Sequence, residues 1–289
     1  METTNKQFMG EHCDYSTARA VILPAPFERS TSYLQGTAAG PQAIIDASCN
    51  VELYDIELNS EPYRLGIHTL PAIQFLEQES VETGLKRIET AVTSIIDDNK
   101  FPVVLGGEHT ISYPIFLALQ RRFPDLSLLH LDAHTDLRDQ YLGDRFSHAC
   151  VMRRIREHTP SIISVGIRSV SYEEAEYMQS EHPIIYFDHD IERHGLPVST
   201  ITEQLTDHIF ITFDLDAVNP AELPAVGTPE PGGLTWYQCV ELFQSLFAKK
   251  NVVGIDMVEL KPDGINLHAD FWAAKMLYKM IGLKFHGTQ

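Results

Sequence analysis

Seven short apolar runs, separated by stretches of helical character, most constrain what this chain can fold into. Each run is nearly continuous rather than alternating between apolar and polar residues, which is typical of strands buried on both faces of a parallel sheet. The pattern predicts an α/β fold with three layers, α/β/α, and a mostly parallel central sheet. The runs are AVILPA (20–25), FPVVLG (101–106), LSLLHLD (126–132), SIISVGI (161–167), PIIYFD (183–188), HIFITFD (208–214) and NVVGIDMVEL (251–260).

The segments between these runs are expected to be helical. No Ser/Gly-rich linker, low-complexity tract or internal repeat marks a domain boundary, so we predict a single domain over residues 1–289. The predicted helices cover residues 40–48, 79–98, 111–122, 147–158, 171–180, 235–248 and 269–282.

Charge and composition exclude several classes of partner. Forty acidic residues against 22 basic ones give a net charge of −18, which repels a nucleic-acid backbone. The first twenty residues lack the features of a secretory leader, and no apolar run approaches the roughly 18 residues of a membrane span. We therefore expect a soluble, cytoplasmic protein without a membrane partner. Its four scattered cysteines suggest neither a zinc knuckle nor a disulfide framework.

Polar or charged side chains follow four of the predicted strands, at the point where each apolar run ends. Because the carboxyl ends of parallel strands meet at one edge of the sheet, we expect these side chains to lie close together. Gly106 and Gly107 allow a tight turn before the first of them. The side chains are His109, Asp132, His134, Asp136, Asp214, Asp216 and Glu259.

The Asp-x-His-x-Asp and Asp-x-Asp patterns place four carboxylates in a small volume, which is costly unless protons are shared or cations are present. Two divalent ions would balance the four charges, and two imidazoles would complete six ligands. Carboxylate and imidazole ligands without thiolate suit manganese, although iron, cobalt or nickel could occupy them. Two ions sharing a bridging water would lower its pKa, which favours hydrolysis over redox chemistry.

Several motifs, taken together, resemble the ureohydrolase family, which includes arginases and agmatinases, and most closely its agmatinase branch. They occur in the family's order and span nearly the whole chain. The motifs are GGEHTIS (106–112), LDAHTDLRD (131–139), FSHACVMRRI (146–155), TFDLDAVNP (212–220), VGTPEPGGLT (226–235) and GIDMVELKP (254–262).

The resemblance implies an arginase-like fold and a manganese enzyme that hydrolyses a guanidinium group to urea and an amine. It implies that one ion takes His109, Asp132, Asp136 and Asp214, and that the other takes Asp132, His134, Asp214 and Asp216. It also implies a homo-oligomer, a trimer or hexamer.

Three residues are predicted to act on the substrate. A cationic guanidinium needs a paired carboxylate, which Glu259 supplies at the end of a strand. Asp136 is placed to pass a proton to the leaving nitrogen. His148 resembles the family histidine that shuttles protons or lines the substrate entrance; the alternative is a helix-start histidine without a catalytic duty.

Two departures from the family pattern bear on substrate choice. Asn219 stands where the family commonly has Asp before Pro, and Ala149 stands where many members have Gly after the histidine. Other candidate groups are assigned structural roles: His130 to the core or the outer shell of the site, Glu108 likewise, and the segment 188–194 to solvated loop or helix-capping chemistry.

The predicted activity is hydrolysis of a small cationic guanidino substrate, with agmatine, which yields putrescine, placed first. Guanidinobutyrate, another guanidino acid, arginine or a formimino amide would use the same site with a different product. The alternative from a different class of function is that the chain is a non-catalytic homologue that acts by binding a protein partner.

Overall fold

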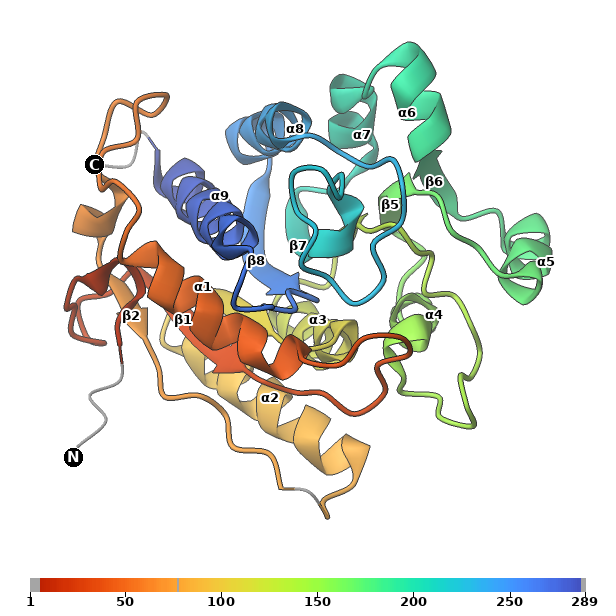
Figure 1. The fold of residues 1–289 in the computed structure, drawn as a ribbon, viewed down its shortest axis with the longest axis horizontal. Helices are drawn as coiled ribbons and strands as arrows, with labels where there is room; N and C mark the ends of the chain where they lie inside the picture. The colour runs from red at the N-terminus through yellow and green to blue at the C-terminus, as the bar shows by residue number, and fades with distance from the viewer. Residues whose placement is uncertain (1–5, 77, 287–289) are drawn as a thin grey trace.

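The computed structural model describes residues 6–76 and 78–286, and an eight-stranded sheet runs through its centre (Figure 1). The strand order is β2-β1-β3-β8-β7-β4-β5-β6, and every neighbouring pair is parallel. The predicted fold class is therefore confirmed. The strands are β1 (Ala20–Ala25), β2 (Ile67–Thr69), β3 (Phe101–Gly106), β4 (Ser127–Leu131), β5 (Ile162–Ile167), β6 (Ile184–Phe187), β7 (His208–Asp214) and β8 (Asn251–Val258).

Apart from strand ends that differ by one residue in β4, β5 and β6, the sheet differs from the prediction at two places. Strand β2 was missed because it has three residues, too few for a recognisable apolar run, and pairs only with β1. The last predicted strand is too long, since β8 ends at Val258 and leaves Glu259 and Leu260 outside it. The early end of β8 matters for the site, because it puts Glu259 in the loop rather than in the sheet.

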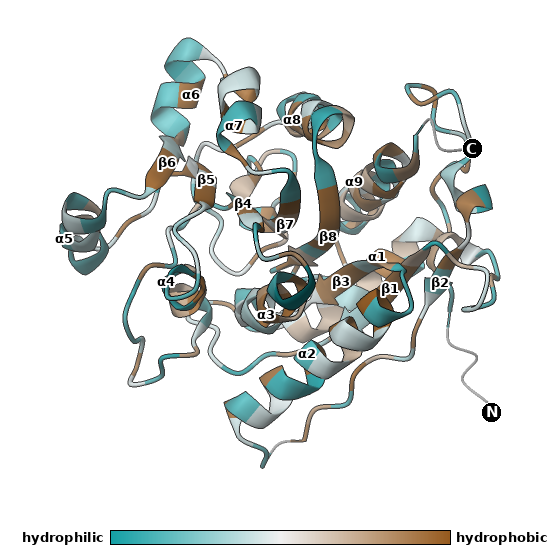
Figure 2. Ribbon diagram, turned by 180° about the vertical axis from the view of Figure 1, so that it is seen from behind, coloured by the Kyte–Doolittle hydropathy of each residue, from teal (hydrophilic) through white to brown (hydrophobic). Residues whose placement is uncertain are grey.

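Helices cover both faces of the sheet, which gives the predicted three layers (Figure 1). Helices α1, α6, α7, α8 and α9 pack on one apolar core, and α2, α3, α4 and α5 pack on the other. Figure 2 shows hydrophobic strands between these layers, with α5 and α6 largely hydrophilic at the β6 edge. The helices are α1 (Gly40–Ser48), α2 (Val81–Asp97), α3 (Ser112–Arg122), α4 (Val151–Arg156), α5 (Tyr172–Glu181), α6 (Asp188–His194), α7 (Val198–Gln204), α8 (Trp236–Lys249) and α9 (Leu267–Phe285).

The segment 188–194, interpreted from the sequence as a solvated loop or cap, forms the short helix α6. Ile191 is its one buried side chain, and Gly195, with a φ of 83°, ends it. Asp188 accepts a hydrogen bond from the backbone N–H of Gly233 at 3.1 Å. The predicted structural role therefore fits, whereas the prediction of a loop was wrong because one apolar residue gives no periodic signal.

A close backbone contact brings the loop after β1 to the loop after β3. A Cβ atom on Gly107 would lie 1.9 Å from the carbonyl oxygen of Phe27, so only glycine fits there. The next residue, Glu108, donates its backbone N–H to that same oxygen at 2.8 Å. The carboxyl end of β3 is thereby joined to the segment that follows Phe27.

No helix in the described part of the chain is long and apolar enough to cross a membrane. Residues 1–5, part of the stretch examined for a secretory leader, lie outside the described residues.

Candidate metal centre

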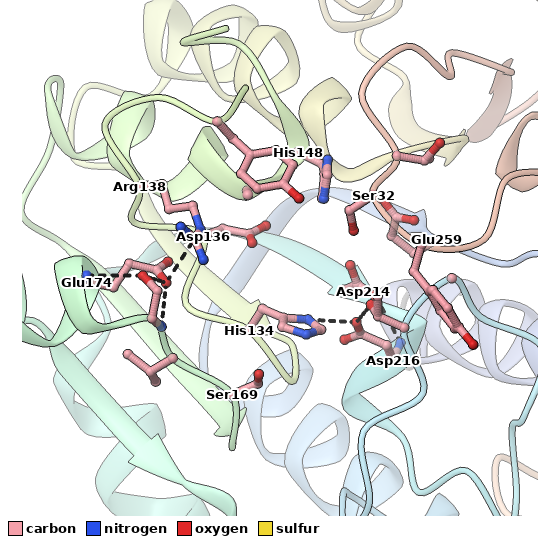
Figure 3. A pocket seen from close by; sticks show the side chains of 18 of the residues that line it. Ser32, His134, Asp136, Arg138, His148, Ser169, Glu174, Asp214, Asp216 and Glu259 are labelled. Atoms are coloured by element: carbon pink, nitrogen blue, oxygen red, sulfur yellow. Dashed lines mark hydrogen bonds and ion pairs between the residues drawn. The ribbon is translucent and has the colours of Figure 1, made fainter. Parts of the chain in front are cut away.

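The predicted metal ligands all lie at the carboxyl edge of the central strands. His109 follows β3, Asp214 is the last residue of β7, and Asp216 lies in the single helical turn Leu215–Ala217 that follows it. Asp132, His134 and Asp136 come from the loop after β4. All six side chains are buried except that of His134, which is 28% exposed. Figure 3 shows His134 pointing toward Asp214 and Asp216, with Asp136 between His134 and His148.

The Nδ1 atom of His109 lies among three carboxylates. It is 3.1 Å from Oδ2 of Asp132, 3.2 Å from Oδ2 of Asp136 and 3.2 Å from Oδ2 of Asp214. None of these contacts has hydrogen-bond geometry, so this buried nitrogen has no hydrogen-bond partner. Ligands placed about 2.1 Å from an octahedral ion lie about 3 Å apart. These three distances therefore suit a divalent cation bound between His109 and the carboxylates.

A second group of ligand atoms lies beside the first. The Nδ1 atom of His134 is 2.9 Å from Oδ2 of Asp216 and 3.5 Å from Oδ1 of Asp132. Asp132 thus presents Oδ2 to the group around His109 and Oδ1 to the group around His134. The donor set fits two cations that share this carboxylate, with oxygen and imidazole ligands and no thiolate.

Burial and proximity strongly perturb the acids and bases of this cluster. Burial opposes a charge on the His109 ring, but Asp132, Asp136 and Asp214 outweigh it and raise its pKa well above the usual value. Burial likewise opposes ionisation of Asp132, yet the neighbouring His130 and His109 hold its pKa well below the usual range. Burial and then the charges of Asp216 and Asp132 raise the pKa of Asp214. In the metal-free protein, protons on the imidazoles therefore balance part of the negative charge of the carboxylates. Bound cations would balance that charge instead.

The pKa of Asp136 gives a pH-dependent prediction. Burial, followed by the charge of Asp132, raises this pKa from 3.8 to about 7. Between these values the unfolded chain loses a proton that the folded, metal-free protein keeps, so the folded state loses stability as pH rises. We expect the metal-free Asp136→Asn variant to gain in unfolding free energy relative to wild type as pH rises from about 4 to about 7.

Urea denaturation at pH steps across this window, with EDTA present, measures the difference between the two proteins. A difference that stays constant from pH 4 to 7 would contradict the assignment. Saturation with Mn²⁺ should oppose the trend in wild type, because the ion binds the ionised carboxylate.

Two of the predicted site residues have left-handed backbone conformations. Asp136 has a φ of 52° and Glu259 a φ of 65°, in the region that residues with a side chain rarely adopt. Such conformations persist where the surrounding structure imposes them, and they concentrate at functional sites. They turn both carboxylates toward the cavity, which Asp136 and Glu259 line.

Outer contacts fix the orientation of the imidazoles. Nε2 of His109 lies 2.9 Å from Oγ1 of Thr212, which donates its hydrogen to Oδ1 of the buried Asp256 at 2.7 Å. Because that hydrogen is committed to Asp256, Nε2 of His109 carries the proton of the neutral ring. Nδ1 is then the nitrogen that would bind a cation after losing its own proton. The two nitrogens of His130 contact Oγ of Ser164 at 3.0 Å and Oδ2 of Asp132 at 2.8 Å, which supports the predicted structural role, although the ring also lies close enough to His109 and Asp136 to join a metal site.

The predicted substrate residues lie around the same cavity. Figure 3 shows His148 on its wall, and Glu259 also lines it. Oε1 of Glu259 accepts the backbone N–H of His109 at 2.7 Å, and burial followed by the charge of Glu108 raises its pKa well above the usual value. Burial lowers the pKa of His148 to about 4, so the ring is neutral at pH 7.

The two departures from the family pattern occupy different positions. Ala149 lines the cavity, next to His148. The side chain of Asn219 accepts the backbone N–H of Ala221 at 2.9 Å and so closes a local turn in its own loop.

Two residues that hold the site together were missed in the sequence. Arg168, just after β5, donates to the backbone carbonyls of Asp216 at 2.6 Å and of Glu230 at 3.1 Å. The buried Glu174 accepts from Oγ1 of Thr135 at 2.7 Å and from the backbone N–H of Leu137 at 2.9 Å. Arg168 shares with the ligands its position at a strand end, which is the signal that could have found it. Glu174 lies on α5 and gives no such signal.

Comparison with known proteins adds independent findings. The sequence model of the arginase family matches residues 18–282. An N(1)-aminopropylagmatine ureohydrolase of Thermus thermophilus is 37% identical over 270 residues, which cover 93% of this chain and 92% of that protein. An agmatinase of Bacillus cereus is 34% identical over 266 residues, covering 90% and 89% of the two chains.

The fold has similar counterparts among solved structures. The agmatine ureohydrolase of Thermoplasma volcanium superimposes with a TM-score of 0.87 at 32% identity, covering 98% of this chain and 95% of the other. The similarity therefore extends over nearly the full length of both chains.

Proposed function

The chain belongs to the arginase family of metal-dependent amidinohydrolases, and we propose from this premise that it hydrolyses a linear guanidino amine to urea and an amine. It is an agmatinase-like ureohydrolase. The observation that carries the proposal is the convergence of three carboxylate oxygens on the unpartnered Nδ1 of His109.

Two Mn²⁺ ions are the proposed cofactors. His109, Asp132, Asp136 and Asp214 would hold one, and Asp132, His134, Asp214 and Asp216 would hold the other. The contacts of Asp132 with both groups support the sharing of this carboxylate. When bound, such ions supply a nucleophile at neutral pH by lowering the pKa of a water molecule.

The residues of the chain then have distinct tasks. The Glu259 carboxylate would pair with the guanidinium of the substrate, since such pairs favour planar, charge-assisted hydrogen bonds. Asp136, which lines the cavity, would carry a proton to the leaving nitrogen. The neutral ring of His148, on the cavity wall, would accept or donate a proton as the amine departs.

Agmatine, giving putrescine, is the first proposed substrate, and N(1)-aminopropylagmatine is the second. Relatives at 34–37% identity carry both activities in their names, which supports a substrate with an amine tail over one with an amino-acid tail. Homo-oligomerisation and a cytoplasmic location remain predictions of the sequence.

A parallel assay of candidate substrates tests the function. Purified protein loaded with Mn²⁺ is expected to release urea from agmatine or N(1)-aminopropylagmatine faster than from arginine, guanidinobutyrate or guanidinopropionate. The His134→Ala variant should lose the activity together with metal. Release of formamide from a formimino substrate would indicate a formimino hydrolase. Absence of turnover despite bound metal would favour a protein that acts by binding a partner.

A further inference from the structure

The wall of the cavity contains a hydrogen-bonded chain that joins three separate segments. Oγ of Ser30, in the loop after β1, lies 3.0 Å from Oε1 of Glu108 and 3.1 Å from Nδ1 of His148. The backbone N–H of His148 also donates to this hydroxyl oxygen at 3.0 Å. One side chain thus contacts both the ring and the backbone of His148.

Glu108 fixes the position of that hydroxyl. Its fully buried carboxylate accepts the backbone N–H groups of Arg29 at 2.8 Å and of Ser30 at 2.7 Å. The hydroxyl of Thr110 donates to it at 2.8 Å. With Ser30 Oγ these make four donors, so the carboxylate can serve this loop only as an acceptor. It therefore holds the Ser30 side chain in place and takes its hydrogen.

The direction of these hydrogen bonds determines where the proton of the neutral His148 ring lies. The single hydrogen of the Ser30 hydroxyl goes to Glu108, so its oxygen can only accept from the ring. Nδ1 of His148 must then carry the hydrogen, which leaves Nε2 with a lone pair for the cavity. Oγ of Ser147 also lies 3.2 Å from Nδ1 of His148. Only the Ser30 hydroxyl has its hydrogen directed to Glu108, so Ser30 is the partner that requires a hydrogen on Nδ1.

We propose that Ser30 is a positioning residue: held by Glu108, it fixes the tautomer of His148 and directs Nε2 toward the substrate. The inference rests on the proposed function for its effect on turnover, whereas its effect on the ring is independent of activity. It also gives a role to the hydrogen bonds between Glu108 and the loop after β1, the loop that contributes Thr31 and Ser32 to the cavity.

Kinetics of single and double variants test the effect on turnover. Ser30→Ala should lower kcat about 10-fold while KM and bound metal stay the same, and Ser30→Thr, which keeps the hydroxyl, should restore most of it. In a His148→Asn background, Ser30→Ala should have no further effect on kcat. Ser94→Ala, an exposed position on α2, is the matched control and should behave as wild type.

Nitrogen NMR of ¹⁵N-histidine-labelled, metal-free protein tests the ring itself and needs no activity. The signal of His148, assigned by its loss in His148→Asn, should show a protonated Nδ1 in wild type and a loss of that preference in Ser30→Ala. Glu108→Gln should reverse it, because an amide N–H facing Ser30 turns the hydroxyl hydrogen toward Nδ1. A protonated Nε2 in wild type, or equal effects of Ser30→Ala on kcat with and without His148, would overturn the inference. Absence of urea release with the expected NMR result would instead refute only the proposed function.

Discussion

Replacing Asp214 by Asn is expected to have opposite effects on activity and on the stability of the metal-free protein. With Mn²⁺ present, kcat/KM should fall by at least about 10³-fold, because the variant loses the charge of a proposed ligand of both ions. Without metal, the variant should unfold at a higher temperature than wild type. The neutral amide relieves a buried carboxylate whose pKa is raised by burial and by the charges of Asp216 and Asp132.

Thermal unfolding with EDTA and with saturating Mn²⁺ measures both sides of this prediction, alongside urea release. Asp97→Asn, an exposed position on α2, is the matched control and should change neither quantity. If the metal-free Asp214→Asn protein is less stable than wild type, the Asp214 carboxylate does not destabilise the metal-free fold, and the prediction is wrong.

Glu259→Gln should separate recognition of the substrate from binding of the metal. We expect kcat/KM for the guanidino substrate to fall about 10²–10³-fold, the cost of leaving a buried charge without its partner. Bound Mn²⁺ should stay at the wild-type level, since Glu259 is not among the proposed ligands. The glutamine oxygen can still accept the backbone N–H of His109, which Glu259 accepts at 2.7 Å, so the loop should keep its conformation.

Kinetics of urea release and metal analysis of the same preparation check this prediction. Glu203→Gln, exposed on α7, provides a matched control with unchanged kinetics. Loss of Mn²⁺ from Glu259→Gln would instead assign this carboxylate to the metal centre, and an unchanged kcat/KM would remove it from substrate binding.

The parts of the structure that the sequence predicted share a strong local signal. Continuous apolar runs identified seven of the eight strands, because buried parallel strands need apolar side chains on both faces. The polar residues that end those runs identified the candidate ligands, since a parallel sheet brings its strand ends together. The structure places His109, Asp132 and Asp214 within 3.2 Å contacts although they lie on three different strands or loops.

The parts that were missed depend on contacts between distant segments. Strand β2 is defined by pairing with β1, and α6 by burial of Ile191 alone. The hydrogen bond between Ser30 and Glu108 joins residues 78 positions apart, and no local pattern encodes it. The left-handed backbone of Glu259 is likewise imposed by its surroundings, since glutamate itself disfavours that conformation.

Calorimetric titration of Mn²⁺ into metal-free protein measures whether the carboxylate cluster holds two divalent ions. We expect two ions bound per chain, protons released on binding, and loss of high-affinity binding in Asp132→Asn, because this residue contacts both ligand groups. Binding that is absent in wild type, or unchanged in Asp132→Asn, would contradict this expectation.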